Sequence, residues 1–461
     1  MQDKKFNVSK YITPNGGEEI LQTAAVQKAI DECAFAGGGE VVFPKGRYVL
    51  STVFLKSNVR IVIDEGAEIL GSLDFYDYAQ EEKIDYPVYQ DSSHTYYHPS
   101  MFVGIDCENI SITGNGRIDM RSVWDEDDVR RIKHRGAKCI ALKNCKNVEI
   151  GGFGIYNATD LGVYFAGCEN VDIYGLKMRV YIDGISPDNS KNVRIRDCEV
   201  EAGDDAIVFK SSYTLNRLDV CKDIHVWNCK LKSRCYALKF GTETNGGFED
   251  IVIEDIQIKE TRIGGIGIES VDGAVIDGVT IRNVKMQNVN APIFIHIGRR
   301  MRGPKGRAIG RIRNVTLENI TAEGPYEPYE IVAWNYYSYK ANDFYQDPKV
   351  FGKAEGFDGT KATDDWQMTS NICGLQESPL ENIVLRNIRL KLDGGVQEFE
   401  RNVPEVAQAY PEVYVYGRIL PAKGIYFRHI NGLTLDNVTV ETYRKDKREA
   451  FVFEQVQRLV K

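Results

Sequence analysis

Apolar and polar residues alternate in short runs along this chain, and each run follows a residue that favours a turn. Ten runs share this form, and they begin at Asn109, Asn147, Asn170, Asn192, Asp223, Asp250, Asp277, Asn314, Asn382 and Gly432. Alternation of period two predicts a strand with one buried face. Between Asn147 and Asp277 the runs recur every 22 to 31 residues. That spacing predicts a solenoid, because each unit buries its apolar face only by stacking on the next.

Leucine-rich repeats have a similar period, so the two kinds of solenoid must be distinguished. The strands here are rich in Val, Ile and Thr, and no segment of helical period lies between them. The leucine framework of that family is also missing. We therefore predict an all-β chain folded as a parallel β-helix.

One segment near the N-terminus has helical periodicity instead. Apolar residues at helical spacing run from Thr23 to Ala36, with Thr23 as a candidate cap and residues 37–39, all Gly, as the stop. A solenoid needs its open end covered, so we predict a capping helix within a cap region of residues 18–50. Strand patterns follow at residues 40–43, 58–63 and 67–70.

The composition is consistent with a single β-helix domain over residues 1–461. The net charge of −8 disfavours a nucleic-acid surface, and no apolar run is long enough to cross a membrane. The chain opens without an apolar signal segment, which fits a cytoplasmic protein or an exported one whose signal is absent from this sequence. Most of the ten cysteines lie beside the strand patterns, so we expect small buried thiols there.

Two segments interrupt the repeat with aromatic residues. Seven lie between Phe75 and Tyr97, and eleven lie between Tyr326 and Trp366, within an insertion of residues 325–380. Long loops on a rigid scaffold often carry binding function, and aromatic rings suit the faces of sugars. The alternative is that these rings only pack each loop on itself.

Three aspartates lie between repeat strands in the centre of the chain. Aligning residues 181–186 with residues 203–208 sets Asp183 over Asp205 on neighbouring coils. Stacked strands are about 4.8 Å apart, so these carboxylates repel each other unless they share a proton or a water, and their ionisation is coupled. Asp204 joins them only if the chain bends just before it, because adjacent strand residues face opposite ways.

Three converging carboxyls supply an acid and a base. Inverting glycoside hydrolysis needs one carboxylic acid at the leaving oxygen and a carboxylate that activates water on the opposite sugar face. The structural alternative is that such aspartates end coil strands by bonding turns, or bind calcium. The stacked Asp183 favours catalysis over that alternative for the pair Asp204 and Asp205.

With these residues the chain resembles the polygalacturonases of glycoside hydrolase family 28 over nearly its whole length. The motifs that carry the resemblance are GGGEVVFPKGRY at 37–48, GAEILG at 66–71, GNGRID at 114–119, DGISPD at 183–188 and GDDAIVFKS at 203–211. The resemblance implies a right-handed parallel β-helix with an inverting site. It implies Asp204 as the general acid and Asp183 with Asp205 as the pair that holds the attacking water.

The chain departs from the family pattern at three motifs. The Asn-Thr-Asp motif keeps only its aspartate, in Tyr181-Ile182-Asp183. The Gly-His-Gly motif falls on residues 235–237, where Tyr236 replaces the imidazole by a phenol. The Arg-Ile-Lys motif falls on residues 267–269, which removes both cations expected to hold a galacturonate carboxylate and adds Glu269. The resemblance therefore leaves the acid and base intact and the usual sugar subsite changed.

Several residues are candidates for contacts with the substrate. The Tyr236 phenol can hydrogen-bond a carboxylate or a sugar hydroxyl, or can simply fill vacated space. Lys239 falls in the column of Gly267, one coil earlier, where it either replaces the lost arginine or pairs with Glu269. We expect an anionic sugar if this cation reaches the cleft.

The remaining candidates lie on or beside repeat strands. Lys210 belongs to the 203–211 motif, His296 ends the strand pattern 292–297, and Arg299 opens the basic loop 299–307. A histidine in such a place is more often packed than catalytic, and a charge run is usually a solvated loop. Each of these residues, and Glu269, is carried forward as a candidate substrate-binding residue.

We therefore expect an inverting hydrolase of α-glycosidic bonds in pectic polysaccharide or oligosaccharide, without a metal or organic cofactor. The expected substrate class includes rhamnogalacturonan. The two long aromatic loops would favour exo action if they close one end of the substrate groove. The alternatives are a hydrolase of a neutral or otherwise charged glycan, a glycan-binding pseudoenzyme, and, last, a lyase or epimerase. We expect a periplasmic or extracellular location, because the polymer lies outside the cell. The oligomeric state does not follow from the sequence.

Overall fold

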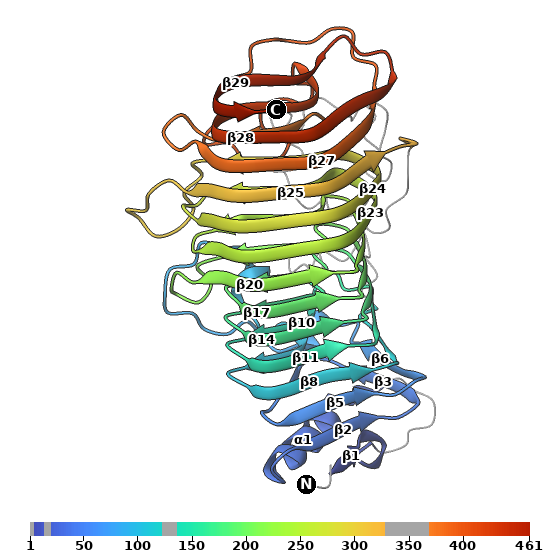
Figure 1. Ribbon diagram of the computed structural model, residues 1–461. Helices are drawn as coiled ribbons and strands as arrows, with labels where there is room; N and C mark the ends of the chain where they lie inside the picture. The colour runs from blue at the N-terminus through green and yellow to red at the C-terminus, as the bar shows by residue number, and fades with distance from the viewer. Residues whose placement is uncertain (1–3, 13–19, 122–135, 328–367) are drawn as a thin grey trace. The chain divides into compact units, whose positions relative to one another are not determined.

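The computed structural model describes residues 4–12, 20–121, 136–327 and 368–461, and these are almost entirely β-structure (Figure 1). The chain divides into two compact units. The first is Met1–Ala202 with Thr214–Asn216, and the second is Gly203–Tyr213 with Arg217–Lys461. The prediction of a single domain stays a prediction.

The described part of the first unit is built from short strands, three short helical segments and one longer helix. The helical elements are η1 (Val8–Lys10), α1 (Thr23–Phe35), η2 (Phe75–Asp77) and α2 (Ser92–Thr95). The strands are β1 (Lys5–Asn7), β2 (Gly39–Phe43), β3 (Gly46–Leu50), β4 (Val53–Phe54), β5 (Val59–Ile63), β6 (Ala67–Gly71), β7 (Ser100–Ile105), β8 (Glu108–Gly114), β9 (Arg117–Asp119), β10 (Lys138–Lys143), β11 (Lys146–Gly151), β12 (Gly154–Tyr156), β13 (Val163–Ala166), β14 (Glu169–Tyr174), β15 (Lys177–Val180), β16 (Ile185–Asp188), β17 (Lys191–Arg196) and β18 (Glu199–Ala202).

These strands form three parallel stacks. One runs β2, β5, β8, β11, β14, β17, and its labelled members lie one above another in Figure 1. The others run β3, β6, β9, β12, β15, β18 and β4, β7, β10, β13, β16. Each turn of the chain gives one strand to each stack, which is the arrangement of a parallel β-helix. The predicted fold class is confirmed.

The second unit repeats this arrangement with longer strands. They are β19 (Ile207–Ser211), β20 (Val220–Trp227), β21 (Lys230–Ser233), β22 (Tyr236–Thr244), β23 (Gly247–Ser270), β24 (Val275–Ile297), β25 (Arg311–Glu323), β26 (Ser370–Cys373), β27 (Leu380–Gly394), β28 (Ala422–Arg444) and β29 (Glu449–Val460). The stack β20, β23, β24, β25, β27, β28, β29 is parallel throughout. Strand β23 also pairs with β22, which pairs with β19.

The turn residues at the start of each run explain the repeat. All ten runs contain a residue with positive φ at or just after their start, and in the run at Asp277 it is the following Gly278. Asn, Asp and Gly are the residues that adopt this left-handed conformation at least cost. The turn residue at the start of each run is thus favoured by the backbone conformation there.

The asparagine side chains also bind one another from coil to coil. In the first unit the Nδ2 of each residue donates to the Oδ1 of the residue one coil earlier, over 2.7 to 2.9 Å. This ladder runs through Asn58, Asn109, Asn147, Asn170 and Asn192. A second ladder, in the second unit, joins Asp255, Asn283, Asn319, Asn387 and Asn437. The sequence pattern did not reveal this second ladder.

The ladder makes a testable contribution to stability. Replacing Asn170 by Ala removes two side-chain hydrogen bonds and leaves at φ +59° a residue that adopts this left-handed conformation less readily than Asn, so we expect a loss of about 2 kcal/mol in the free energy of unfolding. The matched Asn170→Gly variant loses the same hydrogen bonds without the backbone strain and should lose about half as much. Urea denaturation of both variants measures the difference; equal losses would contradict the backbone argument.

The predicted capping helix is present as α1, and its end agrees with the sequence. Val26, Ala29, Ile30 and Cys33 form its buried face. The role expected of Thr23 is wrong: it is the first helical residue, and Gln22 precedes it without a side-chain cap. The Thr23 hydroxyl instead accepts the backbone N–H of Ser51 at 2.8 Å, which ties the helix to the coil below it.

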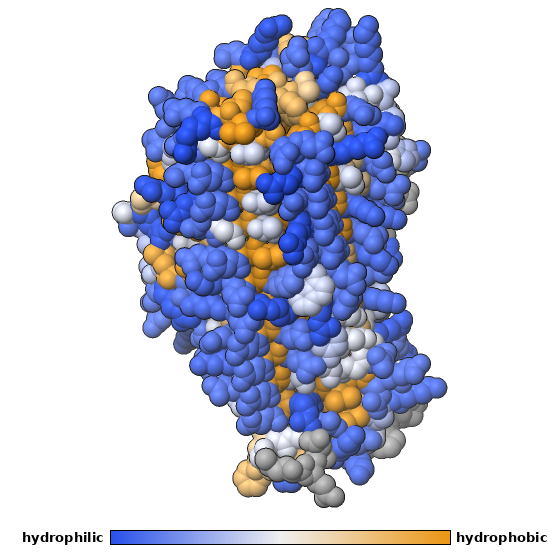
Figure 2. All heavy atoms as spheres, in the orientation of Figure 1, coloured by the Kyte–Doolittle hydropathy of each residue, from blue (hydrophilic) through white to orange (hydrophobic). Residues whose placement is uncertain are grey.

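Polar and apolar positions separate as the alternation requires. Along β11, Val148 and Ile150 are buried while Glu149 between them is exposed. The face visible in Figure 2 is mostly hydrophilic, with apolar side chains showing between polar ones. All ten cysteines are buried free thiols, as expected. Within the described residues no helix is long and apolar enough to cross a membrane.

Candidate active site

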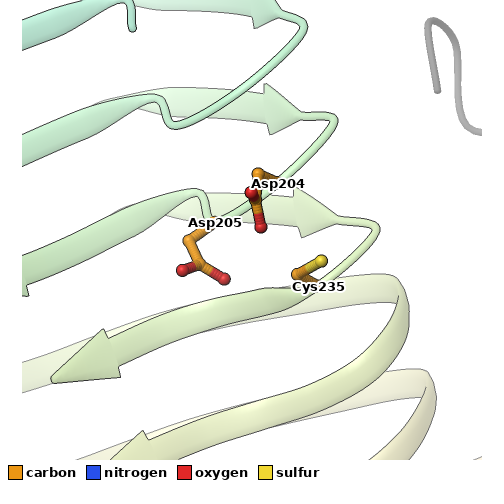
Figure 3. A group of neighbouring side chains, drawn as sticks. All are labelled: Asp204, Asp205 and Cys235. Atoms are coloured by element: carbon orange, nitrogen blue, oxygen red, sulfur yellow. The ribbon is translucent and has the colours of Figure 1, made fainter. Parts of the chain in front are cut away.

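Asp204 and Asp205 lie in the turn that precedes β19, and the chain bends at Gly203 and Asp204 as the sequence required. The two side chains differ in exposure: Asp205 is buried, with 4% of its surface exposed, whereas Asp204 is partly exposed. Figure 3 shows both carboxyl groups directed from this turn toward the strand that begins at Tyr236. One acid group is thus open to a ligand and its neighbour is enclosed.

The carboxylate of Asp205 is held by the next coil. Its Oδ1 accepts the backbone N–H of Tyr236 at 3.0 Å, and its Oδ2 lies 3.8 Å from the Nζ of Lys239. The register of β19 with β22, in which Val208 pairs with Lys239, continues the alignment predicted from the sequence. A hydrogen bond and a nearby cation both favour the ionised form of a carboxyl group.

The thiol of Cys235 completes a group of three potential ligands. Ligand atoms of Asp204, Asp205 and Cys235 lie within 4.8 Å of one another (Figure 3). Burial raises the pKa of Cys235 well above its usual value, and the two neighbouring carboxyls raise it further. The Cys235 thiol therefore keeps its proton beside the two carboxyl groups.

Lys239 lies at the centre of a buried ionic cluster. Its Nζ is 3.4 Å from Glu412, 3.8 Å from Asp205 and 3.9 Å from Glu269. Burial alone would lower the pKa of Lys239, but the three carboxyls raise it well above its usual value. Lys239 pairs with Gly267 in the register of β22 and β23, so the predicted column is confirmed. The ion pair expected as the alternative role of this lysine is present.

Two carboxyl groups of this cluster hold their protons more tightly than usual. Burial raises the pKa of Glu269 to about 8 although Lys239 opposes the shift. Burial also raises the pKa of Glu412, with Lys239 lowering it and Asp204 raising it. At neutral pH Glu269 is therefore mainly protonated. The Lys239 ammonium group then pairs with Asp205 and Glu412.

This shift predicts a dependence of stability on pH. A folded pKa raised to about 8 means that stability is lost as pH rises from the unfolded value to about 8, because the unfolded chain ionises first. Replacing Glu269 by Gln should remove this loss, which we expect to be roughly 1 kcal/mol per pH unit. Urea denaturation at pH 5 and pH 8 measures it, with the exposed Glu249→Gln as control. An equal penalty for Glu269→Gln at both pH values would contradict a protonated Glu269.

Tyr236 fills the space that a longer side chain at position 267 would need. A β-carbon on Gly267 would lie 2.9 Å from the Tyr236 ring, and one on Gly264 would lie 2.3 Å from it. The phenol oxygen accepts the backbone N–H of Val413 at 3.0 Å, while the contact with Asp205 is made by the Tyr236 backbone. The Tyr236 ring thus occupies the space beside Gly267 and Gly264.

A segment far away in the sequence, which contains Glu412 and Val413, covers Tyr236 and Lys239. Glu412 reaches Lys239 across 173 positions, and Val413 packs with Cys235, Tyr236 and Phe294 in one buried cluster. Sequence reasoning missed this segment, because neither a motif nor the repeat marks the region between β27 and β28. The side chains of Lys239 and Glu269 are consequently 4% and 0% exposed.

The other predicted contacts with the substrate are mostly enclosed. Lys210 is buried and pairs with Glu243 at 3.0 Å. His296 is fully buried and stacks on Phe294, and its Nδ1 lies 3.2 Å from the hydroxyl of Tyr416. Burial lowers the pKa of His296 to about 3, so it stays neutral. The structure presents neither side chain to a ligand.

Three arginines of the basic loop 299–307 pair with acidic neighbours: Arg299, Arg300 and Arg302. Arg299 is half-exposed and pairs with Glu377. The Nε of Arg300 donates to the Oδ1 of Asp272 at 3.0 Å, and the Asp272 side chain is 1% exposed. Of this loop, Arg299 is the predicted residue that retains exposed surface.

Asp183 belongs to the first unit, in the turn between β15 and β16, and is buried. Its Oδ2 lies 3.8 Å from the Nε2 of His94, a residue of the aromatic segment 75–97. Tyr97 of the same segment is buried and stacks on Tyr164 at 5.5 Å between ring centroids. Part of this segment thus packs on the solenoid, and sugar binding by it stays a prediction. Most of the 325–380 insertion lies outside the described residues.

A partly exposed aspartate beside a buried one on a parallel β-helix offers two carboxyl groups in different environments, as glycoside hydrolysis requires. Solved structures share this fold. A Yersinia enterocolitica family 28 exopolygalacturonase matches with a TM-score of 0.71 and 19% identity, over 99% of this chain and 78% of that one. An exopolygalacturonase from Thermotoga maritima matches with a TM-score of 0.65 and 19% identity, over 85% and 88%.

The sequence profile described as "Glycosyl hydrolases family 28" matches residues 36–332, and the chain belongs to this family. The expected family and the expectation of a glycoside hydrolase are confirmed. A "Probable polygalacturonase" of Vitis vinifera is 25% identical over 255 residues, covering 52% of each protein. An "Exo-poly-alpha-D-galacturonosidase" of Dickeya chrysanthemi is 24% identical over 302 residues, covering 54% of this chain and 50% of that protein. The chain matches about half the length of these curated relatives.

Proposed function

We propose that this protein hydrolyses α-glycosidic bonds of pectic polysaccharide or oligosaccharide with inversion of configuration. Asp204 is the general acid, and Asp183 with Asp205 holds the attacking water. The observation that carries the proposal is the unequal pair: Asp204 is partly exposed, while Asp205 is buried against a backbone N–H and the cation of Lys239. Such environments separate the proton affinities of two carboxyls, as acid and base roles require.

The chemistry then divides between the two kinds of carboxyl group. Asp204 gives its proton to the glycosidic oxygen as the bond to the anomeric carbon breaks. The ionised aspartates take a proton from water as its oxygen attacks that carbon from the opposite face. The part assigned to Asp183 rests on the alignment of coils and on the family motif.

The curated relatives support the substrate class. Their printed names describe polygalacturonase and exo-poly-α-D-galacturonosidase activity, and we extend an α-linked uronate polymer and exo action to this chain as proposals. Since pectic polymer lies outside the cell, the proposal includes a periplasmic or extracellular location.

A second substrate class is favoured by one observation. Lys239 is enclosed, and its charge is shared by Asp205 and Glu412. No cation in this column, among the residues that the structure describes, is open to a sugar carboxylate. A neutral glycan, or one charged at a different position, is therefore the second candidate substrate.

Product release from a panel of glycans tests the proposal. The panel holds polygalacturonate, rhamnogalacturonan and neutral polysaccharides with their oligosaccharides, each incubated with the wild type and with Asp204→Asn. Release of reducing sugar that the substitution abolishes supports the hydrolase and names its substrate. An unsaturated, ultraviolet-absorbing product would indicate a lyase, and binding without any product would indicate a pseudoenzyme.

A further inference from the structure

His94 lies between two carboxylates in the first unit. It is a residue of the short helix α2, and its side chain is 6% exposed. Its Nδ1 is 2.7 Å from the Oδ1 of Asp91, and its Nε2 is 3.8 Å from the Oδ2 of Asp183. Both ring nitrogens thus face an acidic oxygen, and only a doubly protonated ring can donate toward both.

The backbone and the ring of His94 are held from several sides. Asp91 caps α2 by accepting the His94 backbone N–H at 3.2 Å. The His94 carbonyl accepts the Tyr164 hydroxyl at 3.0 Å and the Thr214 hydroxyl at 2.5 Å. The Tyr164 ring packs edge-on against the imidazole at 5.5 Å. The imidazole is therefore fixed in its orientation toward Asp183.

We infer that His94 is a positioning residue for Asp183 in the hydrolysis proposed above. The inference rests on that proposed function. The described acidic groups around the ring are Asp91 on its own helix, Asp183 on the facing turn, and Asp188, which accepts the Tyr164 hydroxyl at 3.1 Å. The neighbouring carboxylates attract a positive charge on the His94 ring. The contact between His94 and Asp183 is enclosed, and charges are weakly screened there.

The consequence for the reaction is that Asp183 stays ionised and correctly oriented as a base. At 3.8 Å the contact is longer than a hydrogen bond, so the effect is electrostatic. Removing the imidazole should lower kcat and leave KM nearly unchanged, because His94 acts through Asp183. It should also move the acidic limb of the kcat profile to higher pH, since Asp183 then takes up a proton more readily.

Kinetics of four variants of the full chain test the inference on the glycan that the wild type hydrolyses. We expect His94→Gln to lower kcat about 100-fold and Asp91→Asn to lower it about 10-fold. Imidazole added to His94→Ala should restore part of the lost rate, which a purely structural role would not allow. His98→Gln is the matched control. His98 follows the aromatic segment that contains His94, but its ring packs edge-on against Phe54 of β4. Its kcat should stay within about twofold of the wild type.

Two results would overturn this inference but not the proposed function, provided that the wild type hydrolyses a glycan and Asp204→Asn does not. One is a kcat of His94→Gln within threefold of the wild type with an unmoved acidic limb. The other is a lower kcat of His94→Ala that added imidazole does not restore, together with a lower melting temperature of this variant. A folded wild type without turnover on any glycan would overturn the proposed function and this inference together.

Discussion

Replacing Asp204 by Asn lowers kcat for glycan hydrolysis by about 10³-fold or more and leaves the fold intact. The amide has nearly the same shape but no proton to give to the leaving oxygen, and a positioned general acid contributes about 10² to 10⁴ in rate. Asp204 is partly exposed, so the substitution does not change the packing of the buried core. We therefore expect the melting temperature to change little and KM to stay within a few-fold.

Initial rates over a range of substrate concentrations measure this effect. The exposed Asp250 is the matched control, because Asn at that position also tolerates its φ of +54° and the side chain is 70% exposed. Asp250→Asn should retain full activity. An Asp204→Asn enzyme with more than a tenth of the wild-type kcat would show that another group protonates the leaving oxygen.

Replacing Lys239 by Met destabilises the protein by about 3 to 5 kcal/mol at neutral pH. The substitution keeps much of the apolar side-chain volume but leaves Asp205 and Glu412 enclosed without their cation, and breaking a buried ion pair by removing one partner carries a cost of this size. The loss should shrink toward pH 5, because protonation of the carboxyls then relieves the uncompensated charge.

Urea denaturation at pH 5 and pH 7 measures this loss. Lys222→Met is the control, since Lys222 pairs with Glu249 at 3.0 Å on the surface with 46% of its side chain exposed. An exposed pair contributes less than about 1 kcal/mol. If Lys239→Met costs no more than this control, Lys239 does not hold the cluster together, and a role in binding substrate becomes the better interpretation.

The sequence was a good guide to the coils, because their determinants are local. A left-handed turn residue followed by alternating apolar positions specifies one strand and its buried face, and Asn170 or Asp250 shows the effect directly. The register also followed from the sequence, since an offset of 31 residues sets Val208 beside Lys239. Thr23 was the exception, because the coil contact at Ser51 competes with capping.

The surroundings of the aspartates could not be predicted in the same way. Glu412 reaches Lys239 over 173 positions, and His94 reaches Asp183 from a loop without the repeat. Neither contact has a spacing that a pattern could reveal. The resemblance predicted that Tyr236 and Gly267 depart from the family motifs, and the structure adds that a β-carbon at Gly267 would clash with the Tyr236 ring.

The stereochemistry of the first product tests the central claim most directly. Proton NMR during the first minutes of turnover, with an excess of enzyme and a short oligosaccharide of the glycan that the wild type cleaves, identifies the anomer released before mutarotation. Inverting hydrolysis of an α-bond by Asp204 with a water-activating base predicts the β-anomer first. Release of the α-anomer first would contradict that assignment and indicate a covalent intermediate on one of the aspartates.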